Sequence, residues 1–297
     1  MKLVSAPESI THLQLLSILV TEISRRNIID NRLRILDAGC GNAHLTTFLH
    51  LNLAALFPMV EFEIHGYDLA DYGVQANDFH SKALEWCEQI CPDVRWEDRL
   101  KLITHGQSWP FESSFFDIVI SNQVLEHVSD HQHFFLEHIR VLKDGGYGAH
   151  LFPLKHYVLE GHLLMPFVHR IRDWYFLKAY IQFMSQIGIG KYQVGQGSID
   201  EFSVRHADYM IFNTNYLTYS EVMSVVKRAQ LRPSLKYTSA FYLHKLRQIF
   251  KFRMRIDLGR HKRSGLLYGV VNHCLKYVSS ITLFVEKENT YIRGVDR

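Results

Sequence analysis

The sequence predicts an α/β fold with a Rossmann-like, doubly wound sheet of seven strands, and helical insertions after strand 5 and between strands 6 and 7. Three observations predict it. Residues 33–49, LRILDAGCGNAHLTTFL, join a short apolar run to a glycine turn and then to an apolar pattern at helical spacing. Strand-like and helix-like segments alternate from there to residue 153. The run FFDIVISN, 115–122, is apolar and β-branched, as expected of a strand buried on both faces.

Composition is that of an ordinary globular protein, with 47% hydrophobic and 21% charged residues among 297. The net charge of +3 is close to neutral, so we expect no nucleic acid as a partner. Cys40, Cys87, Cys91 and Cys274 have no zinc spacing, and we predict no metal site. Cys87 and Cys91 are expected on one buried helix face, which suits a reducing, cytoplasmic environment.

Local signals place the elements of the first half. An amphipathic helix is expected over 9–25, because the apolar run there is too short and interrupted for a signal peptide or membrane span. After the glycine turn we expect a helix to residue 57, a strand over 62–67, a helix over 75–91 and a strand over 100–104. Ser129 and Gln132 have capping-box spacing, which predicts a helix ending at Gly145-Gly146, and a fifth strand follows over 147–152.

The second half breaks this alternation. Residues 155–213 are rich in His, Tyr and Phe and contain an irregular glycine stretch, so we expect an insertion. Thr218 and Glu221 form a second capping box, opening a helix to about residue 229. A sixth strand is predicted over 232–240 and a seventh over 281–287, with a basic helical insertion between them.

The glycine turn predicts a ligand, because glycines allow unusual φ/ψ and leave room beside the backbone. A dinucleotide fingerprint would need a third glycine where His44 stands. Asp37, just before the turn, is able to accept a hydrogen bond from a cationic amino group. A negatively charged pyrophosphate would be repelled by this carboxylate. An NAD-dependent oxidoreductase, a sugar-nucleotide enzyme and a non-catalytic binding protein are the alternatives; His44, Asp37 and the lack of a helical Tyr-x-x-x-Lys pair disfavour the first two.

The stretch LDAGCGN resembles the first motif of the class I S-adenosylmethionine-dependent methyltransferases of the type 11 kind. Later features agree in order: Asp68 in HGYDLA, the segment WPFESSFFDIVISNQVLEHV over 109–128, and Gly-Gly before the fifth strand. The resemblance covers roughly residues 33–153. It implies S-adenosyl-L-methionine as the cofactor and methyl transfer as the reaction.

The resemblance also implies roles. Asp37, Gly39 and Gly41 would shape the methionine end, Asp68 would bind the ribose, and Asn122 and Gln123 would lie with Ser121 at the sulfonium. The segment ITHGQSWPF has no acid for the adenine amino group, so we expect Gly106 and Gln107 there. The implied cofactor-binding set is Asp37, Gly39, Cys40, Gly41, Asp68, Leu69, Gly106, Gln107, Asn122 and Gln123. Plain structural roles, such as a helix-dipole partner for Asp37 and a turn for Asp68, are the alternative.

A hydroxyl acceptor would need a nearby base. The segment PLKHYVLEGHLLMPFVHRIRDW follows the fifth strand and resembles an EGH…PFxH stretch of methyltransferases found with bacterial surface-polysaccharide pathways, which implies O-methylation of a small or glycan- or lipid-linked acceptor. His162 and His169, seven apart, would face one way on a helix. We predict His162 or His169 as base or acceptor anchor, Glu160 as orienter and His127 as a further candidate; chance clustering among 18 histidines is the alternative.

Residues 245–263 predict an anionic membrane partner at the inner face of the membrane, because eight basic residues interleave with apolar ones against the single acid Asp257. A solvated helix packed on the domain is the alternative. We predict five units: 1–154 as the cofactor-binding core, 155–213 as an acceptor-side insertion or lid, 214–240 as core continued, 241–278 as the basic insertion, and 279–297 as the last strand and tail.

Overall fold

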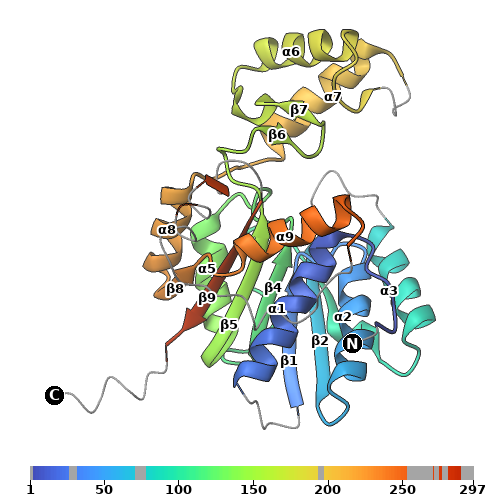
Figure 1. Cartoon of the computed structure of the whole chain (residues 1–297), viewed down its shortest axis with the longest axis vertical. Coiled ribbons are helices and arrows are strands. Elements are labelled where there is room, and N and C mark those ends of the chain that lie inside the picture. Colours follow the sequence, from blue (N-terminus) through green and yellow to red (C-terminus); the bar gives the residue numbers. More distant parts are fainter. Residues whose placement is uncertain are drawn as a thin grey trace, which may run out of the picture.

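The computed structural model describes residues 3–26, 32–70, 78–192, 197–252, 270, 274–275 and 280–288. Its centre is a seven-stranded sheet of order β3-β2-β1-β4-β5-β9-β8 (Figure 1). The first five strands are parallel: β1 (Arg32–Ala38), β2 (Glu61–Leu69), β3 (Leu100–Ile103), β4 (Phe116–Asn122) and β5 (Leu142–Phe152). The strand order reverses between β1 and β4, so the predicted Rossmann-like fold is confirmed.

The last two strands make the sheet mixed. β9 (Ile281–Lys287) lies antiparallel to both β5 and β8 (Leu231–Ser234). The predicted seventh strand is confirmed, but the sixth was predicted too long over 232–240. The pairing with β9 ends at Ser234, and α9 (Thr238–Ile249) begins soon after a turn in which the Thr238 N–H donates to the Leu235 carbonyl at 3.0 Å.

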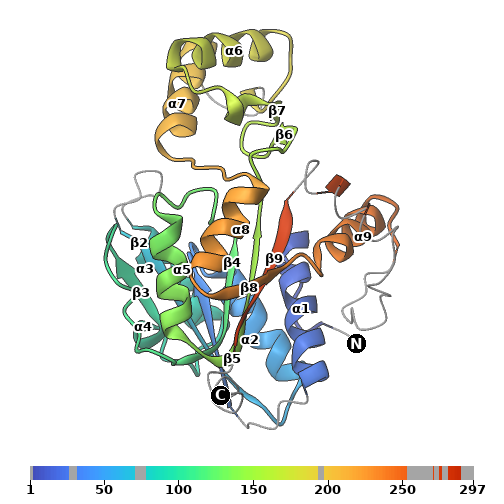
Figure 2. The ribbon, with the colours of Figure 1, turned by 90° about the vertical axis from the view of Figure 1, so that its left-hand side faces the viewer.

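Helices cover both faces of the sheet (Figure 2). One face carries α1 (Ile10–Arg26), α2 (His44–Leu56) and α9, and the other carries α5 (His131–Val141) and α8 (Tyr219–Arg228). α3 (Phe79–Ile90) and α4 (Trp96–Arg99) pack beside β3, where the side chains of Cys87 and Cys91 are buried as predicted. Both faces of the central strands are thereby excluded from water, which accounts for their continuous apolar runs.

Two predictions for α5 were wrong. Asp130, and not Ser129, caps the helix, because its side chain accepts from the His133 N–H at 2.9 Å. The helix also ends at Val141 and not at Gly145-Gly146, which lie within β5. The carbonyl oxygens of Arg140 and Val141 instead accept from the N–H groups of Ser114 and Phe115. The box of Thr218 and Glu221 at α8 is confirmed.

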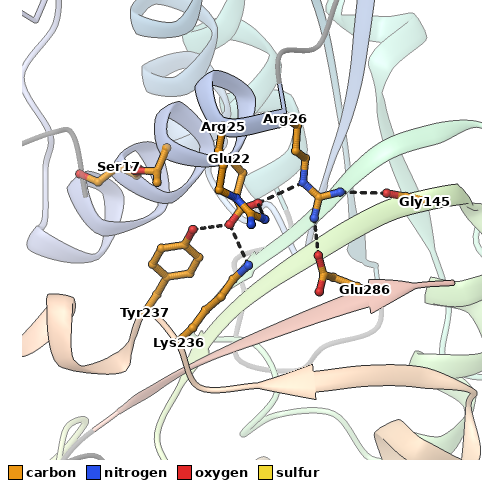
Figure 3. Close-up of polar contacts among 9 residues, drawn as sticks. Ser17, Glu22, Arg25, Arg26, Gly145, Lys236, Tyr237 and Glu286 are labelled. Carbon is orange, nitrogen blue, oxygen red and sulfur yellow. Dashed lines mark hydrogen bonds and ion pairs between the residues drawn. The ribbon is translucent and has the colours of Figure 1, made fainter. Parts of the chain in front are cut away.

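The predicted N-terminal helix is present as α1, and it is buried on every side from His12 to Ile23, so it is a core helix rather than an amphipathic one. Glu22 anchors it (Figure 3). Its fully buried carboxylate accepts from Arg25 at 2.6 Å, from Arg26 at 3.0 Å, from Lys236 at 2.8 Å and from the Tyr237 hydroxyl. Burial alone would raise the pKa of Glu22, but the bonds from Lys236, Tyr237 and Arg25 outweigh it and lower the pKa to about 2. This buried charge joins α1 to the turn before α9.

The segment between β5 and α8 forms a lobe beyond the carboxyl ends of the parallel strands (Figures 1 and 2). It contains β6 (Leu159–Glu160), β7 (Met165–Pro166), the 3-10 helix η1 (Val168–Arg170), α6 (Trp174–Gln186) and α7 (Ile199–Phe212). The lobe has its own apolar cluster, which includes Leu163, Leu177, Ile181, Phe202 and Met210. The predicted division of the chain into five units stays a prediction, and most of the unit 241–278 lies outside the described residues.

Candidate functional site

A cavity of about 580 Å³ opens at the carboxyl ends of β1, β2 and β4. This is the switch point of the sheet, where open α/β folds bind their ligands. All of the residues predicted to bind the cofactor line the cavity: Asp37, Gly39, Cys40, Gly41, Asp68, Leu69, Gly106, Gln107, Asn122 and Gln123. The structure therefore brings the whole predicted set together, although the role of each residue stays a prediction.

The glycine turn follows β1 and is shaped by close approaches. Gly39 has φ +77°, and a Cβ there would lie 2.6 Å from a methyl group of Val124. Gly41 has φ +50°, and its N–H donates to Asp68 Oδ2 at 2.6 Å. The other oxygen of Asp68 accepts from the Leu69 N–H at 2.7 Å. Backbone donors therefore fix the Asp68 carboxylate at the end of β2, facing the turn.

Asp37, the next-to-last residue of β1, is a buried acid with 1% of its surface exposed. Its Oδ2 accepts from the Thr46 hydroxyl of α2 at 2.8 Å. Burial raises the pKa of Asp37 to about 7; the Thr46 bond opposes this effect and the nearby Asp68 carboxylate adds to it. A cation in the cavity would favour the ionised form, so Asp37 is suited to a ligand with an amino or sulfonium group.

Two unusual groups stand at the end of β4. The Oδ1 of Asn122 is buried and has no hydrogen-bond partner within the part of the chain that the structure describes. Gln123 is left-handed at φ +56°, and its N–H donates to the Leu151 carbonyl at 2.8 Å. Buried acceptors are rarely left unsatisfied, and strained residues gather at functional sites, so both groups point to a ligand in the cavity.

The turn after β3 closes another side of the cavity. The Oε1 of Gln107 accepts from the Thr104 N–H at 2.9 Å, so that oxygen already serves its own turn. The Gln107 carbonyl accepts from His133 Nε2 at 3.2 Å. Gly106 has φ +77° and nothing within 4 Å of the position of a Cβ. The turn is thus tied to α5 while Gly106 stays open.

Sequence reasoning missed several residues of the cavity wall. Trp109 and Tyr67 pack with ring centroids 4.8 Å apart, and His12 brings the N-terminal helix to the cavity. Asp130 and His133 add polar groups from the start of α5. Trp109 lies in the quoted segment 109–128, so the sequence did offer a signal for it. No sequence signal indicated His12, because its helix precedes the motif and reaches the cavity only through tertiary packing.

Of the predicted catalytic residues, only His127 lines the cavity. Its Nδ1 donates to the Asn213 carbonyl at 2.8 Å, and since a carbonyl only accepts, Nε2 is the nitrogen able to take a proton. Burial lowers the pKa of His127 to about 4, which keeps the ring neutral near pH 7. The ring of His162 lies beside it, with centroids 5.1 Å apart, in the turn between β6 and β7.

Glu160 orients His162. Its buried carboxylate accepts from His162 Nδ1 at 2.5 Å, from the Leu163 N–H at 2.7 Å and from the Tyr216 hydroxyl at 2.9 Å. Burial alone would raise the pKa of Glu160, but the bonds from His162 and the backbone lower it to about 2. The buried His169 donates from Nε2 to the Lys155 carbonyl at 3.0 Å, and neither residue lines the cavity.

The expectation that His162 and His169 share a helix face was wrong. Residues 156–170 form the short strands β6 and β7 and the 3-10 helix η1, because Gly161 and Pro166 interrupt any longer helix. Among the described residues, no group of three or more His, Cys, Asp or Glu side chains is placed to hold a metal ion.

Three features fit the class I S-adenosylmethionine-dependent methyltransferases: a Rossmann-like sheet, a glycine turn facing an acid near the end of β2, and a cavity at the switch point. Dinucleotide-binding domains share these features, and the comparison with known families separates the two classes. The family comparison agrees: residues 36–149 match a family described as "Methyltransferase domain". The chain is an S-adenosylmethionine-dependent methyltransferase carrying this domain.

Solved structures show distant likeness only. A methyltransferase from Mesorhizobium loti is 14% identical, with 89% of this chain and 96% of that chain covered and a TM-score of 0.45. The YcgJ protein of Bacillus subtilis is 16% identical, with 94% and 99% covered and a TM-score of 0.45. Phosphoethanolamine N-methyltransferase 2 of Haemonchus contortus, solved with S-adenosyl-L-methionine, is 14% identical, with 95% and 57% covered and a TM-score of 0.45. No curated protein sequence matches the chain.

The cavity fits S-adenosyl-L-methionine, the cofactor of this class. The unsatisfied Asn122 Oδ1 and the buried Asp37 carboxyl are acceptors for a ligand with a cationic amino-acid end. Gly41 leaves the backbone open, since only Asp68 Oδ2, at 4.0 Å, lies near the position of a Cβ there, whereas Gly39 allows the close approach of Val124. A volume of about 580 Å³ is in the ordinary range for small-molecule sites.

Proposed function

We propose that the protein methylates an oxygen atom of a small, glycan-like or lipid-linked acceptor. The observation that supports this proposal is His127, a neutral imidazole at the cavity wall whose tautomer is set by the Asn213 carbonyl. A hydroxyl must lose its proton as it is methylated, whereas a thiol or carbon acceptor needs less help. A built-in proton acceptor beside the cavity therefore favours oxygen.

S-adenosyl-L-methionine, when bound, supplies the electrophilic methyl group. Asp37 and Asn122 would hold its amino-acid end, Asp68 its ribose hydroxyls and the turn at Gly106 its adenine. His127 Nε2 would then take the proton of the acceptor hydroxyl. We favour His127 as the base over His162 and His169, since it alone among these lines the cavity.

His162 is proposed as an acceptor anchor and Glu160 as its positioning residue. Glu160 binds both the ring and the backbone N–H of His162, at 2.5 and 2.9 Å, and so fixes the imidazole. The Tyr209 ring lies 5.3 Å from that of His162 and 6.0 Å from that of His127. Three polar rings would thus face the acceptor on the side of the inserted lobe. His169 would only hold the lobe to the Lys155 backbone.

The charges of the residues that line the cavity limit the kinds of acceptor further. The described residues lining the cavity include Asp37, Asp68 and Asp130 but no Lys or Arg. A phosphate or carboxylate at the reacting end would meet like charge there without a cationic partner. We therefore propose that the acceptor presents a neutral hydroxyl to the cavity.

The test is methyl transfer from radiolabelled S-adenosyl-L-methionine into a pool of sugars, polyols and glycolipids extracted from a bacterial lysate. We expect an O-methylated product, and about 100-fold slower transfer by His127→Ala with unchanged affinity for S-adenosylhomocysteine. The matched control is His169→Gln, which keeps a donor for the Lys155 carbonyl and should transfer like wild type. A product methylated on nitrogen or carbon, or full transfer by His127→Ala, would contradict the proposal.

We also propose peripheral contact with an anionic membrane through the end of α9. Residues 238–252 contain Lys245, Arg247 and Lys251 and no acid, while Ile249, Phe250 and Phe252 are 70%, 64% and 66% exposed. Cations beside exposed aromatic side chains suit a bilayer interface. Residues 253–263 of the predicted surface lie outside the described residues, and no described helix is long and apolar enough to cross a membrane. Co-sedimentation with anionic vesicles checks this contact.

A further inference from the structure

We propose that Asn215 is a positioning residue that fastens the loop carrying His127 to the inserted lobe. The loop comprises residues 123–130, between β4 and α5, and the return segment comprises residues 213–217, between α7 and α8. The inference deepens the proposed function, since it rests on His127 being the base. Asn215 itself is not among the residues that line the cavity.

Asn215 contacts this loop through both its backbone and its side chain. Its backbone N–H donates to the Glu126 carbonyl at 2.6 Å. Its side-chain Nδ2 lies 3.1 Å from the carbonyl oxygen of Val128 and 3.2 Å from that of Ser129. Val128 and Ser129 line the cavity, so one side chain holds the backbone of the cavity wall.

His131, at the start of α5, also bonds to this loop and to Asn215. Its Nε2 donates to the Leu125 carbonyl at 2.7 Å, which leaves Nδ1 as an acceptor 3.4 Å from the Asn215 Nδ2. Burial lowers the pKa of His131, so the ring stays neutral and Nδ1 keeps its lone pair near neutral pH. The loop is thereby held between the first turn of α5 and the return segment.

The neighbours of Asn215 contact the other parts of the acceptor side. The Asn213 carbonyl accepts from His127 Nδ1, and the Tyr216 hydroxyl donates to Glu160 at 2.9 Å. The two chain crossings between core and lobe also pair, since the Lys155 N–H donates to the Leu217 carbonyl at 2.8 Å. Asn213, Asn215 and Tyr216 therefore connect the base, the cavity wall and the orienter of His162, and Asn215 supplies the side-chain bonds to the wall.

The position of His127 should consequently depend on Asn215. Without the amide, the loop loses its side-chain donors, and the bond from His127 to the Asn213 carbonyl loses its fixed geometry. Among the described residues, the groups that act on His127 include the Asn213 carbonyl and the side chains of His162, Glu160 and Tyr209, and an Asn215 variant replaces none of them. A change in His127 would thus report on the loop.

The test is nuclear magnetic resonance of histidine-labelled protein saturated with S-adenosylhomocysteine, which needs no acceptor. In wild type we expect His127 as the Nδ1–H tautomer without titration between pH 5 and 8. Asn215→Ala should give mixed tautomers and a pKa moving towards about 6.5, the value of a solvated imidazole. Phe212→Ala is the matched control, because this side chain stands next to the return segment and is 75% exposed, and it should match wild type.

Asn215→Leu keeps about the size of the side chain, adds no charge and removes its donors, so it replaces the alanine variant if that one does not fold. Deuterium exchange of amides in 124–131 should be faster in either variant. An unchanged His127 tautomer and pKa in a folded Asn215 variant would overturn the inference. Failure of the proposed function would look different. The Asn215 variants would then still change the tautomer and pKa of His127, but the protein would methylate no hydroxyl.

Discussion

At the scale of single residues, Asp37 carries the most specific chemistry of the cavity. It is a buried acid with one hydroxyl donor, and burial raises its pKa to about 7. A group with a raised pKa holds its proton below that pH, and a cationic ligand favours the carboxylate form. Cofactor binding and proton release should therefore be linked around neutral pH.

We predict that the affinity for S-adenosyl-L-methionine is highest near pH 8 and falls below pH 7, by up to about tenfold per pH unit, because Asp37 must first lose its proton. Calorimetry in buffers of different ionisation enthalpy would detect the released proton. Thr46→Val removes the bond that lowers the pKa and should move the midpoint to higher pH. Constant affinity between pH 6 and 8 would contradict a cationic contact at Asp37.

The residues that line the cavity could be predicted from the sequence where they belong to a motif at the end of a strand. The glycine turn, Asp68 and Asn122 all stand at strand ends, and parallel strand ends meet at one edge of a sheet. Asn213 and Asn215 were missed because they contact residues more than eighty positions earlier. His127 was ranked below His162 because only the folded chain shows which histidine lies at the cavity.

At the scale of elements, boundaries were harder to predict than element types. Ser129 and Asp130 are both good capping residues, and only the position of His133 decides between them. Ser234 ends β8 because its partner β9 pairs no further in that direction, which no signal within 232–240 reveals. Such errors moved ends but left the order of strands and helices intact.

The end of α9 gives a prediction at this scale. Replacing Ile249, Phe250 and Phe252 by Ser should weaken co-sedimentation with phosphatidylglycerol-containing vesicles by at least about tenfold, since each buried apolar side chain contributes more than about 1 kcal/mol. Phe176→Ser with Phe183→Ser is a matched control, because these side chains are 63% and 58% exposed on α6. Equal binding by both variants, or no preference for anionic over neutral vesicles, would reject α9 as the contact.

At the scale of the whole molecule, the two halves of the reaction differ in how they are built. The cofactor half lies in one continuous domain of strands and turns, so its motifs could be read in order along the chain. The acceptor half that we propose would be assembled from the loop before α5, the inserted lobe and the return segment, which meet only in the folded protein. This difference explains why the sequence led to the cofactor and left the acceptor open.

The measurement that tests the central claim most directly is calorimetric titration of the protein with S-adenosyl-L-methionine, S-adenosylhomocysteine and NAD. We predict saturable binding of the first two at one site and none of NAD. Asp68→Ala should weaken that binding by roughly 1 to 3 kcal/mol through the loss of charged hydrogen bonds, and Asp68→Asn by less. Binding of NAD alone, or affinity for S-adenosyl-L-methionine that Asp68→Ala leaves unchanged, would contradict the account.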